Sequence, residues 1–308
     1  MQWPEGKEFA FTIFDDTDNG TIANTKPVYD LLHELNFRTT KSVWVYPPRG
    51  RFGGQSLADA GYLDWVRELQ ALGFEVALHG VGDGPFSRAE ILAGLERFRQ
   101  LLGDYPRIHT NHASNPDSIY WLKDRFNWPY NFLYGLYCTL NKRRRVTAQG
   151  DKEGSDHFWG DACKEHIDYI RNYTCRNLNT LGFNPSMPYI DEVKQTYSNR
   201  WFSSSDGHTV EEFCDLIRPE SVEQLRSEKG ACIMYTHFAS GFVDGRGRLL
   251  PLFQKRMEHL ASLNGFFEPT SAILDHLKSR QDPKLAFARP STTKWLADRI
   301  VKQFHYGR

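Results

Sequence analysis

The sequence predicts an α/β protein that folds as one distorted (β/α) barrel. Two patterns favour this class. Short apolar strands alternate with amphipathic helices through the first half of the 308 residues, and polar side chains follow these strands where each one ends. Repeated βα units imply a parallel sheet with right-handed crossovers. The chain contains no internal repeat and no low-complexity linker, so we expect a single domain over residues 1–308.

Periodicity identifies the elements of the first half. The first strand is the run Phe9–Phe14, which is rich in aromatic and β-branched residues and leads directly into Asp15 and Asp16. Ser87, with Glu90 three residues later, forms a capping box that starts a helix. The other elements predicted here are strands at 42–46, 75–78 and 107–110, and helices at 24–36 and 63–72.

The second half is less regular. Strands are predicted near 201–204 and at 231–235, and helices near 161–176, 209–217, 251–263 and 270–280. Residues 126–160 are aromatic without a clear period, and we interpret them as an insertion or a long substrate loop.

The charge balance argues against a nucleic-acid partner. The chain has 38 basic and 38 acidic side chains, a formal net charge of +0, and no known nucleic-acid-binding motif. Its one strong charge run, Lys142–Arg145, is typical of a solvated loop, with a phosphate contact as the alternative interpretation.

Cysteine usage and the N-terminus indicate a compartment. The five cysteines are scattered without a C-x-x-C pair, which disfavours a disulfide framework and suits a reducing cytoplasm. The N-terminus lacks the pattern of a secretory signal, and no stretch approaches the ~18 apolar residues of a membrane span. We therefore expect a cytoplasmic protein without a transmembrane segment, and leave its oligomeric state open.

Polar side chains collect at four predicted strand ends. The carboxyl ends of strands in a (β/α) barrel converge on one face, so these side chains should share a site. Histidines and carboxylates together suit a divalent metal such as zinc, with an open position for water. The residues at these four ends are Asp15 and Asp16, then His79, then His109, Asn111 and His112, and finally His237.

The two adjacent aspartates should perform different tasks. Neighbouring residues of a strand point to opposite faces, so Asp15 and Asp16 are not expected to share one role. One of them is a candidate to hold a metal, and the other to handle a proton. A solvated turn is the alternative, because Asp18, Asn19 and Gly20 follow at once.

The order of these motifs resembles the polysaccharide deacetylases, the carbohydrate esterases that share the chitooligosaccharide deacetylase homology domain. The resemblance spans roughly residues 8–280 and rests on the order and spacing of short motifs. It implies a metal-dependent hydrolase, with zinc as the expected metal, that cleaves a carbon–nitrogen amide bond. The segments that carry it are Phe14-Asp15-Asp16 for T-F-D-D-G, Leu78-His79-Gly80 for the first metal histidine, and Tyr235-Thr236-His237 for the late L-x-H.

By this resemblance, Asp15 is the catalytic base and Asp16 a metal ligand. The first metal histidine falls on His79, and the histidine that protonates the leaving amine falls on His237.

The sequence departs from the family pattern at the second metal histidine. That position is Asp83, which can still bind zinc, but imidazole is the expected ligand type and His112 stands at a neighbouring strand end. The third ligand is therefore His112, Asp83 or water, with a slight preference for His112. The R-P-P-x-G segment is absent and Thr17 replaces the motif glycine, which indicates a divergent member.

The expected substrate is a carbohydrate carrying an N-acetyl group. Aromatic side chains near loops can stack on sugar rings or simply pack the core. A surface-glycan, nucleotide-linked or lipid-linked sugar suits the expected compartment. Two alternatives remain: hydrolysis of a non-sugar ureide or cyclic imide, and a non-catalytic carbohydrate-binding protein with a relict site. The candidate substrate-binding residues are Asn111, Trp159, Asp161 and Trp201.

Overall fold

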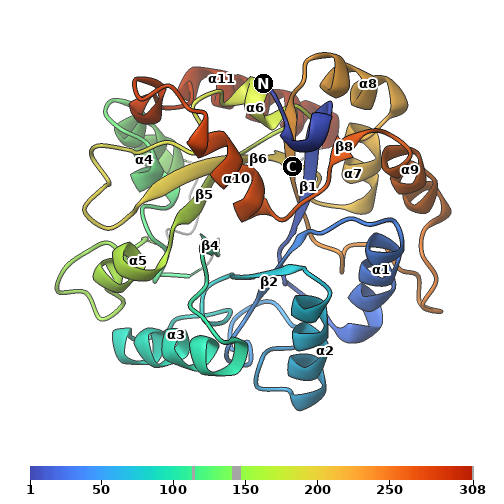
Figure 1. Ribbon diagram of the computed structural model, residues 1–308. Coiled ribbons are helices and arrows are strands. Elements are labelled where there is room, and N and C mark those ends of the chain that lie inside the picture. The colour runs from blue at the N-terminus through green and yellow to red at the C-terminus, as the bar shows by residue number, and fades with distance from the viewer. Residues whose placement is uncertain (113–114, 141–146, 307–308) are drawn as a thin grey trace.

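A closed parallel barrel forms the centre of the protein (Figure 1). The computed structural model describes residues 1–112, 115–140 and 147–306, so the basic run at 142–145 lies outside the described residues. The strands are β1 (Phe9–Asp15), β2 (Thr40–Val43), β3 (Glu75–Leu78), β4 (Ile108–Thr110), β5 (Tyr169–Cys175), β6 (Arg200–Asp206), β7 (Ala231–Thr236) and β8 (Gly265–Phe266).

Strand β1 closes the ring. The strands β2 to β7 pair in chain order, and β1 then pairs with β7 along its length and with β2 at its carboxyl end. The short strand β8 pairs with the start of β1. All of these pairings are parallel, which confirms the predicted (β/α) barrel.

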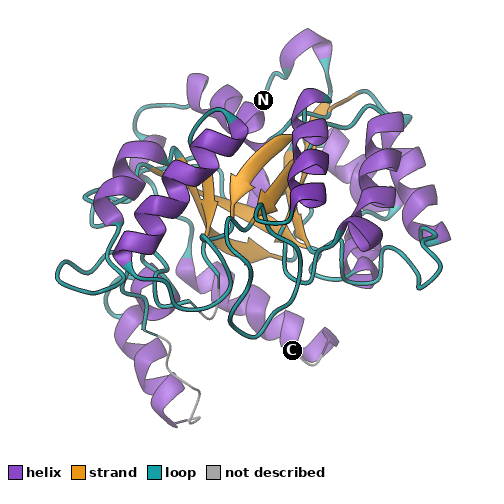
Figure 2. Cartoon of the chain, turned by 90° about the horizontal axis from the view of Figure 1, so that it is seen from below, coloured by secondary structure: helices purple, strands orange, loops and turns teal. Residues whose placement is uncertain are grey.

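Figure 2 shows the helices arranged around the strands. The α-helices are α1 (Ile22–Glu34), α2 (Ala60–Ala71), α3 (Arg88–Leu102), α4 (Tyr130–Leu140), α5 (Gly160–His166), α6 (Thr180–Phe183), α7 (Val210–Leu216), α8 (Pro219–Ser227), α9 (Pro251–Ala261), α10 (Thr270–Ser279) and α11 (Thr292–Tyr306). Short 3-10 helices are η1 (Pro4–Gly6), η2 (Leu122–Arg125) and η3 (Leu285–Phe287).

Alternate residues of β1 enter two different apolar clusters. Ala10 and Phe14 belong to the cluster inside the barrel, whereas Phe9, Phe11 and Ile13 pack under the surrounding helices. This alternation is the ordinary two-residue period of a strand covered on both faces. Helix α10 closes the end of the barrel at which the strands begin, and it adds Ile273, Leu274 and Leu277 to the inner cluster.

Most predicted elements agree with the structure, with one clear exception. The capping box of Ser87 and Glu90 is present at the start of α3. The predicted helix at 161–176 is wrong beyond residue 166, because α5 ends at His166 and Tyr169–Cys175 is strand β5. The aromatic and β-branched residues of this segment fit a pleated, buried strand better than a helix.

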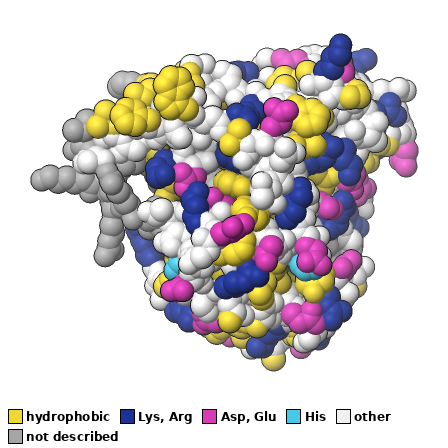
Figure 3. All heavy atoms as spheres, turned by 90° about the vertical axis from the view of Figure 1, so that its left-hand side faces the viewer, with side chains coloured by type: hydrophobic (Ala, Val, Ile, Leu, Met, Phe, Trp, Pro, Cys, Tyr) yellow, Lys and Arg dark blue, Asp and Glu magenta, His cyan; other side chains and the backbone are white. Residues whose placement is uncertain are grey.

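The segment predicted as an insertion or substrate loop contains α4. Several apolar side chains at and just before this helix are exposed, and Trp128 is the most exposed of them at 82%. Figure 3 shows hydrophobic side chains gathered on a projecting edge of this side of the molecule. The exposed members are Trp128, Phe132, Leu133 and Leu136.

The described residues contain no helix that is both long and apolar enough to cross a bilayer. Cys163, Cys175, Cys214 and Cys232 are buried free thiols.

The carboxylate of Asp15 is buried where several elements meet. Its Oδ2 accepts hydrogen bonds from Lys41 Nζ at 2.9 Å and from the Tyr29 hydroxyl at 3.0 Å. Its Oδ1 accepts a hydrogen bond from the backbone N–H of Phe238 at 2.9 Å, directly after β7. Burial acts to lower the pKa of Lys41, but the charge of Asp15 outweighs it and raises that pKa. Asp15 thus joins α1, β2 and the segment after β7 to the end of β1.

We predict that Asp15→Ala lowers the free energy of unfolding by about 3–5 kcal/mol, because it leaves the fully buried Lys41 without its counter-charge. Denaturant unfolding of both proteins measures this loss. The matched control is Asp30→Ala, which removes an exposed carboxylate paired with Lys26 and should cost less than about 1 kcal/mol. Equal losses in the two variants would contradict the structural role of Asp15.

Candidate metal centre

The site residues continue the inward-facing series of their strands. A side chain two positions beyond an inward-facing one points to the same side of the sheet. Four residues of the inner cluster are each followed, two positions later, by a residue that lines the cavity at the carboxyl end of the barrel. The pairs are Phe14 and Asp16, Ala77 and His79, Tyr169 and Arg171, and Ile233 and Tyr235.

Asp18, His79 and His112 bring three metal-ligating atoms within 4.8 Å of one another. Asp18 Oδ1 lies 3.4 Å from His79 Nε2 and 3.3 Å from His112 Nε2. Zinc ligands at about 2.1 Å in tetrahedral geometry stand about 3.4 Å apart, so these spacings fit one such ion. Asp18 Oδ1 is also buried without a hydrogen-bond partner among the described residues, as expected for an atom reserved for a cation.

Neighbouring polar groups orient the two histidines. Nδ1 of His79 lies 2.7 Å from Thr110 Oγ1 and 3.2 Å from the Thr110 carbonyl oxygen. Asp83 lies behind His112, with its Oδ1 3.6 Å from Nδ1 of the imidazole, and accepts a hydrogen bond from the Phe52 backbone at 2.6 Å. Such outer partners hold metal-binding imidazoles in place. The two candidates for the third ligand therefore stand in series, with His112 facing Asp18 and Asp83 behind it.

Asp16 forms a buried ion pair with Arg171 of β5. Arg171 Nη1 donates to Asp16 Oδ1 at 3.0 Å, and Nη2 donates to Oδ2. Burial acts to raise the pKa of Asp16, but the charge of Arg171, followed by that of His79, outweighs it and lowers the pKa. Asp16 is therefore held ionised, with its Oδ2 3.8 Å from His79 Nε2.

His237 completes the group from the end of β7. Its Nε2 lies 3.4 Å from Asp18 Oδ2, and its ring centroid is 4.5 Å from that of His208. Burial acts to lower the pKa of His237, but the hydrogen bond to Asp18 and the charge of Asp16 raise it overall. The nearby imidazoles of the three histidines in turn lower the pKa of Asp18 against the effect of burial.

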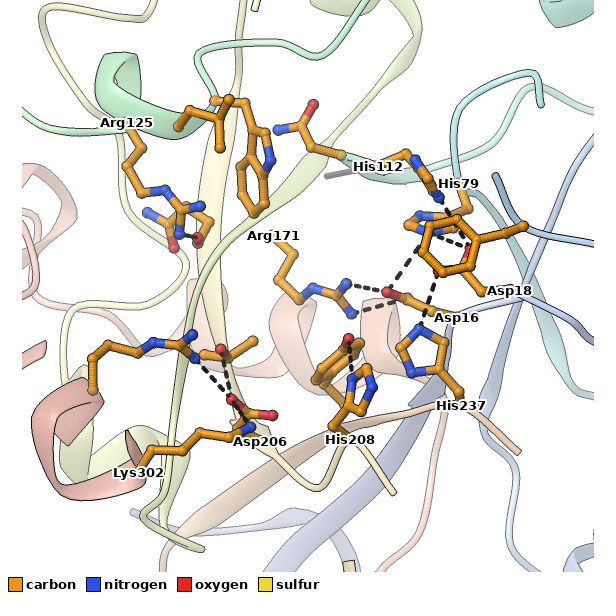
Figure 4. A pocket seen from close by; sticks show the side chains of 18 of the residues that line it. Asp16, Asp18, His79, His112, Arg125, Arg171, Asp206, His208, His237 and Lys302 are labelled. Atoms are coloured by element: carbon orange, nitrogen blue, oxygen red, sulfur yellow. Dashed lines mark hydrogen bonds and ion pairs between the residues drawn. The ribbon is translucent and has the colours of Figure 1, made fainter. Parts of the chain in front are cut away.

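These groups share a cavity of about 460 Å³ (Figure 4). Asp16, Asp18, His79, His112 and His237 lie on one side of it, and Arg171 reaches in from β5. Aromatic side chains contribute to its lining from five segments: Phe52, Trp121, Tyr134, Tyr235 and Trp295.

Asp15 and three of the four predicted substrate-binding residues lie away from this cavity. Asp15 faces the helices and holds Lys41, as described above. Trp159 is buried against His109, and Trp201 is buried near Tyr120, so both face away from the barrel interior. Asp161 is half exposed and pairs with Arg88 on the surface.

Asn111 does line the cavity, but its side chain mainly supports the following loop. Its Oδ1 accepts a hydrogen bond from the Ile119 backbone N–H at 2.7 Å, and its Nδ2 donates to the Ile119 carbonyl oxygen at 2.9 Å.

Sequence reasoning missed Asp18 and Arg171 as site residues. Asp18 stands in a turn beyond the end of β1, where the two-residue period of a strand no longer applies, so no local pattern marked it. Arg171 lay inside a segment predicted to be helical, although its aromatic and β-branched neighbours indicated a strand that would place it two residues beyond an inward-facing tyrosine.

The fold is similar to solved structures of deacetylases and an allantoinase. No protein-family model and no curated protein matches the sequence. A protein of Mycobacterium smegmatis assigned as a polysaccharide deacetylase superposes with a TM-score of 0.50 at 14% identity, covering 94% of this chain and 97% of that one. The Puue allantoinase gives a TM-score of 0.52 at 12% identity, covering 90% and 93%.

A second protein assigned as a polysaccharide deacetylase, from Pseudomonas aeruginosa PAO1, gives a TM-score of 0.51 at 11% identity, again covering 90% of this chain and 93% of that one. The chain has the fold of these proteins. The resemblance predicted from the motif order is thus confirmed at the level of the fold, over nearly the whole length of both chains.

His109, one of the strand-end histidines, predicts a pH dependence of stability. Burial lowers its pKa from 6.5 to about 3, so the folded protein holds it neutral while the unfolded chain takes up a proton below pH 6.5. From this residue we expect the free energy of unfolding to fall by about 1.4 kcal/mol for each pH unit below that point. Denaturant unfolding at pH 7, 6 and 5 should show a steeper loss in the wild type than in His109→Gln. Parallel curves would contradict a buried neutral His109.

Proposed function

We propose that this protein is a metal-dependent hydrolase that cleaves an amide bond, with an N-acetylated carbohydrate as its substrate. The observation that carries the proposal is the arrangement around one cavity of a candidate metal group, an ion-paired aspartate and a histidine. The fold shared with deacetylase and allantoinase structures supports the same class of reaction.

Asp18, His79 and His112 would hold the metal in this proposal. Their donor set of one carboxylate oxygen and two imidazole nitrogens is a usual set for catalytic zinc, and it leaves a position open. A divalent ion bound there supplies Lewis-acid chemistry, polarising the amide carbonyl and activating water. Asp18 thereby takes the ligand role that the motif order assigned to Asp16.

Asp16 is the proposed general base, and Arg171 positions it. Asp16 accepts a proton from the water whose oxygen attacks the carbonyl carbon, while Arg171 keeps the carboxylate oriented through two hydrogen bonds. His237, whose Nε2 lies 3.4 Å from Asp18 Oδ2, donates a proton to the amide nitrogen as the carbon–nitrogen bond breaks. The products are a carboxylic acid and an amine. We propose Asp16 rather than Asp15 as the base, because the Asp15 carboxylate is engaged by Lys41 and Tyr29.

The cavity supports a sugar-sized substrate. Its volume of about 460 Å³ exceeds what an acetyl group needs, and Trp121 and Trp295 in its lining contribute apolar surface against which a sugar ring can pack. The ureide or cyclic-imide alternative draws its support from the likeness to the Puue allantoinase, which covers as much of this chain as one of the deacetylase structures does.

We predict that Asp18→Ala and His79→Ala abolish zinc retention, whereas Asp16→Asn keeps about one equivalent. The variants differ because Asp18 and His79 each supply one of the three ligand atoms, whereas Asp16 supplies none. Mass spectrometry of protein purified without chelator and dialysed against zinc measures the content. The control is Asp64→Ala, which removes an exposed carboxylate of α2 that does not line the cavity. Loss of zinc in Asp16→Asn but not in Asp18→Ala would reverse the assignment.

We further predict that the Asp16→Asn protein, although it retains metal, turns over about 10²–10⁴-fold more slowly than the wild type. Release of acetate or amine from N-acetylated sugars, and of product from ureides and cyclic imides, identifies the substrate class. Sugar binding that is insensitive to chelator and to Asp16→Asn, without release of product from any compound, would instead support the non-catalytic carbohydrate-binding alternative.

A further inference from the structure

A second wall of the cavity lies across from the metal group. We call it the cationic wall and define it by Arg125 at the end of η2 and by Arg299 and Lys302 of α11. Figure 4 shows Arg125 and Lys302 on the far side of the cavity from Asp18, His79 and His112, with Arg171 between the two sides. The three cations of the cationic wall have no role in the proposed hydrolysis.

Two of the three cations are neutralised within the protein. Lys302 Nζ lies 2.9 Å from Asp206 Oδ2 and 3.0 Å from Glu212 Oε2. Arg299 Nη1 lies 3.3 Å from the same Asp206 oxygen, which also accepts a hydrogen bond from Thr174 at 3.2 Å. Two carboxylates therefore balance Lys302 and Arg299, and they leave no negative charge over for the third cation.

Arg125 has no counter-charge among the described residues. Its side chain donates one hydrogen bond there, from Nη1 to the Asn172 carbonyl oxygen at 3.1 Å, and its Nε is buried without a partner. Burial, with a further contribution from the charge of Arg299, lowers the pKa of Arg125 to about 10. Arg125 is half-buried, and a guanidinium that is partly removed from water without an anion is unfavourable. An anion that arrives with a ligand would supply the missing counter-charge.

Aromatic rings fix the position of this guanidinium. Its central carbon lies 3.8 Å from the ring centroid of Trp121 and 5.5 Å from that of Trp295. Stacking on these rings holds the planar fork in place, and the N–H groups of Nη1 and Nη2 that do not bond Asn172 can meet the oxygens of one oxyanion. The tryptophans also line the cavity, so the body of a ligand can pack where its charged group is bound.

We propose that the cationic wall binds an oxyanion of the substrate, a carboxylate or a phosphate, so that the enzyme acts on an anionic N-acyl compound in preference to a neutral one. Arg125 makes the direct contact, while Arg299 and Lys302 keep the carboxylates of Asp206 and Glu212 from repelling the oxyanion. This inference rests on the proposed function in one respect, namely that the bound compound is a substrate of the enzyme. The binding of the oxyanion itself requires only the cavity and Arg125.

The test measures binding separately from turnover. Calorimetric titrations use zinc-loaded Asp16→Asn protein, which lacks the proposed base, with three probes: N-acetylglucosamine, its 1-phosphate, and N-acetylmuramic acid as the carboxylate. We expect one or both anionic probes to bind about 10–100-fold more tightly than the neutral sugar, the range typical of hydrogen bonds to charged groups. The probe that shows this preference identifies phosphate or carboxylate as the recognised group.

Variants at one residue then assign the preference. Arg125→Gln should abolish it and Arg125→Lys should retain part of it, since the ammonium keeps the charge without the planar fork. Arg88→Gln, which removes an arginine paired with Asp161 on the surface, is the matched control and should bind all probes as before. Arg299→Gln, at a side chain 41% exposed, tests the other part of the wall and should weaken the preference.

Equal binding of the anionic and neutral probes, or a preference that survives Arg125→Gln, would overturn the inference. An Arg125-dependent preference in a protein that hydrolyses none of the probes would support the cationic wall while refuting the hydrolase. Hydrolysis of neutral sugars without any preference would do the opposite, so the two proposals fail in distinguishable ways.

Discussion

The buried carboxylate of Asp15 is the constraint on which the site depends. It joins the ends of β1 and β2 through Lys41, anchors α1 through Tyr29, and receives the backbone N–H of Phe238 after β7. Asp16 and His237 are the chain neighbours of these two anchored positions, so the same carboxylate fixes both proposed proton-transfer groups. Buried charge pairs of this kind are costly to break, which gives the barrel mouth a defined geometry before any ligand binds.

A single parity rule then assembles the rest. Residues two beyond the inner cluster of the barrel turn into the cavity, and residues one position away turn under the helices. Asp16, Arg171 and His79 obey the first half of this rule, and Asp15 and Trp201 obey the second. The site is therefore a continuation of the barrel core, in which polar side chains replace apolar ones at the layer where the strands end.

The sequence predicted the barrel, its parallel strands and the histidines of the site, because strand ends and apolar runs are local signals. His79, His112 and His237 all reach the cavity as expected. The carboxylates were harder, because the motif order placed the proton acceptor and the metal ligand on Asp15 and Asp16, whereas the structure turns Asp15 outward and brings Asp18 to the histidines. Arg171 was missed because its segment was predicted to be helical, although its neighbours indicate a strand. The cationic wall depends on the long-range packing of α11, for which no local pattern exists.

The central claim is that Asp18, His79 and His112 form the metal centre while Asp16 stands beside it. The most direct measurement is anomalous X-ray scattering at the zinc edge from crystals grown with zinc. We predict one strong peak about 2.0–2.2 Å from Asp18 Oδ1 and from Nε2 of both histidines. A peak coordinated by Asp15 or Asp16 in place of Asp18, or no peak in the cavity, would contradict it.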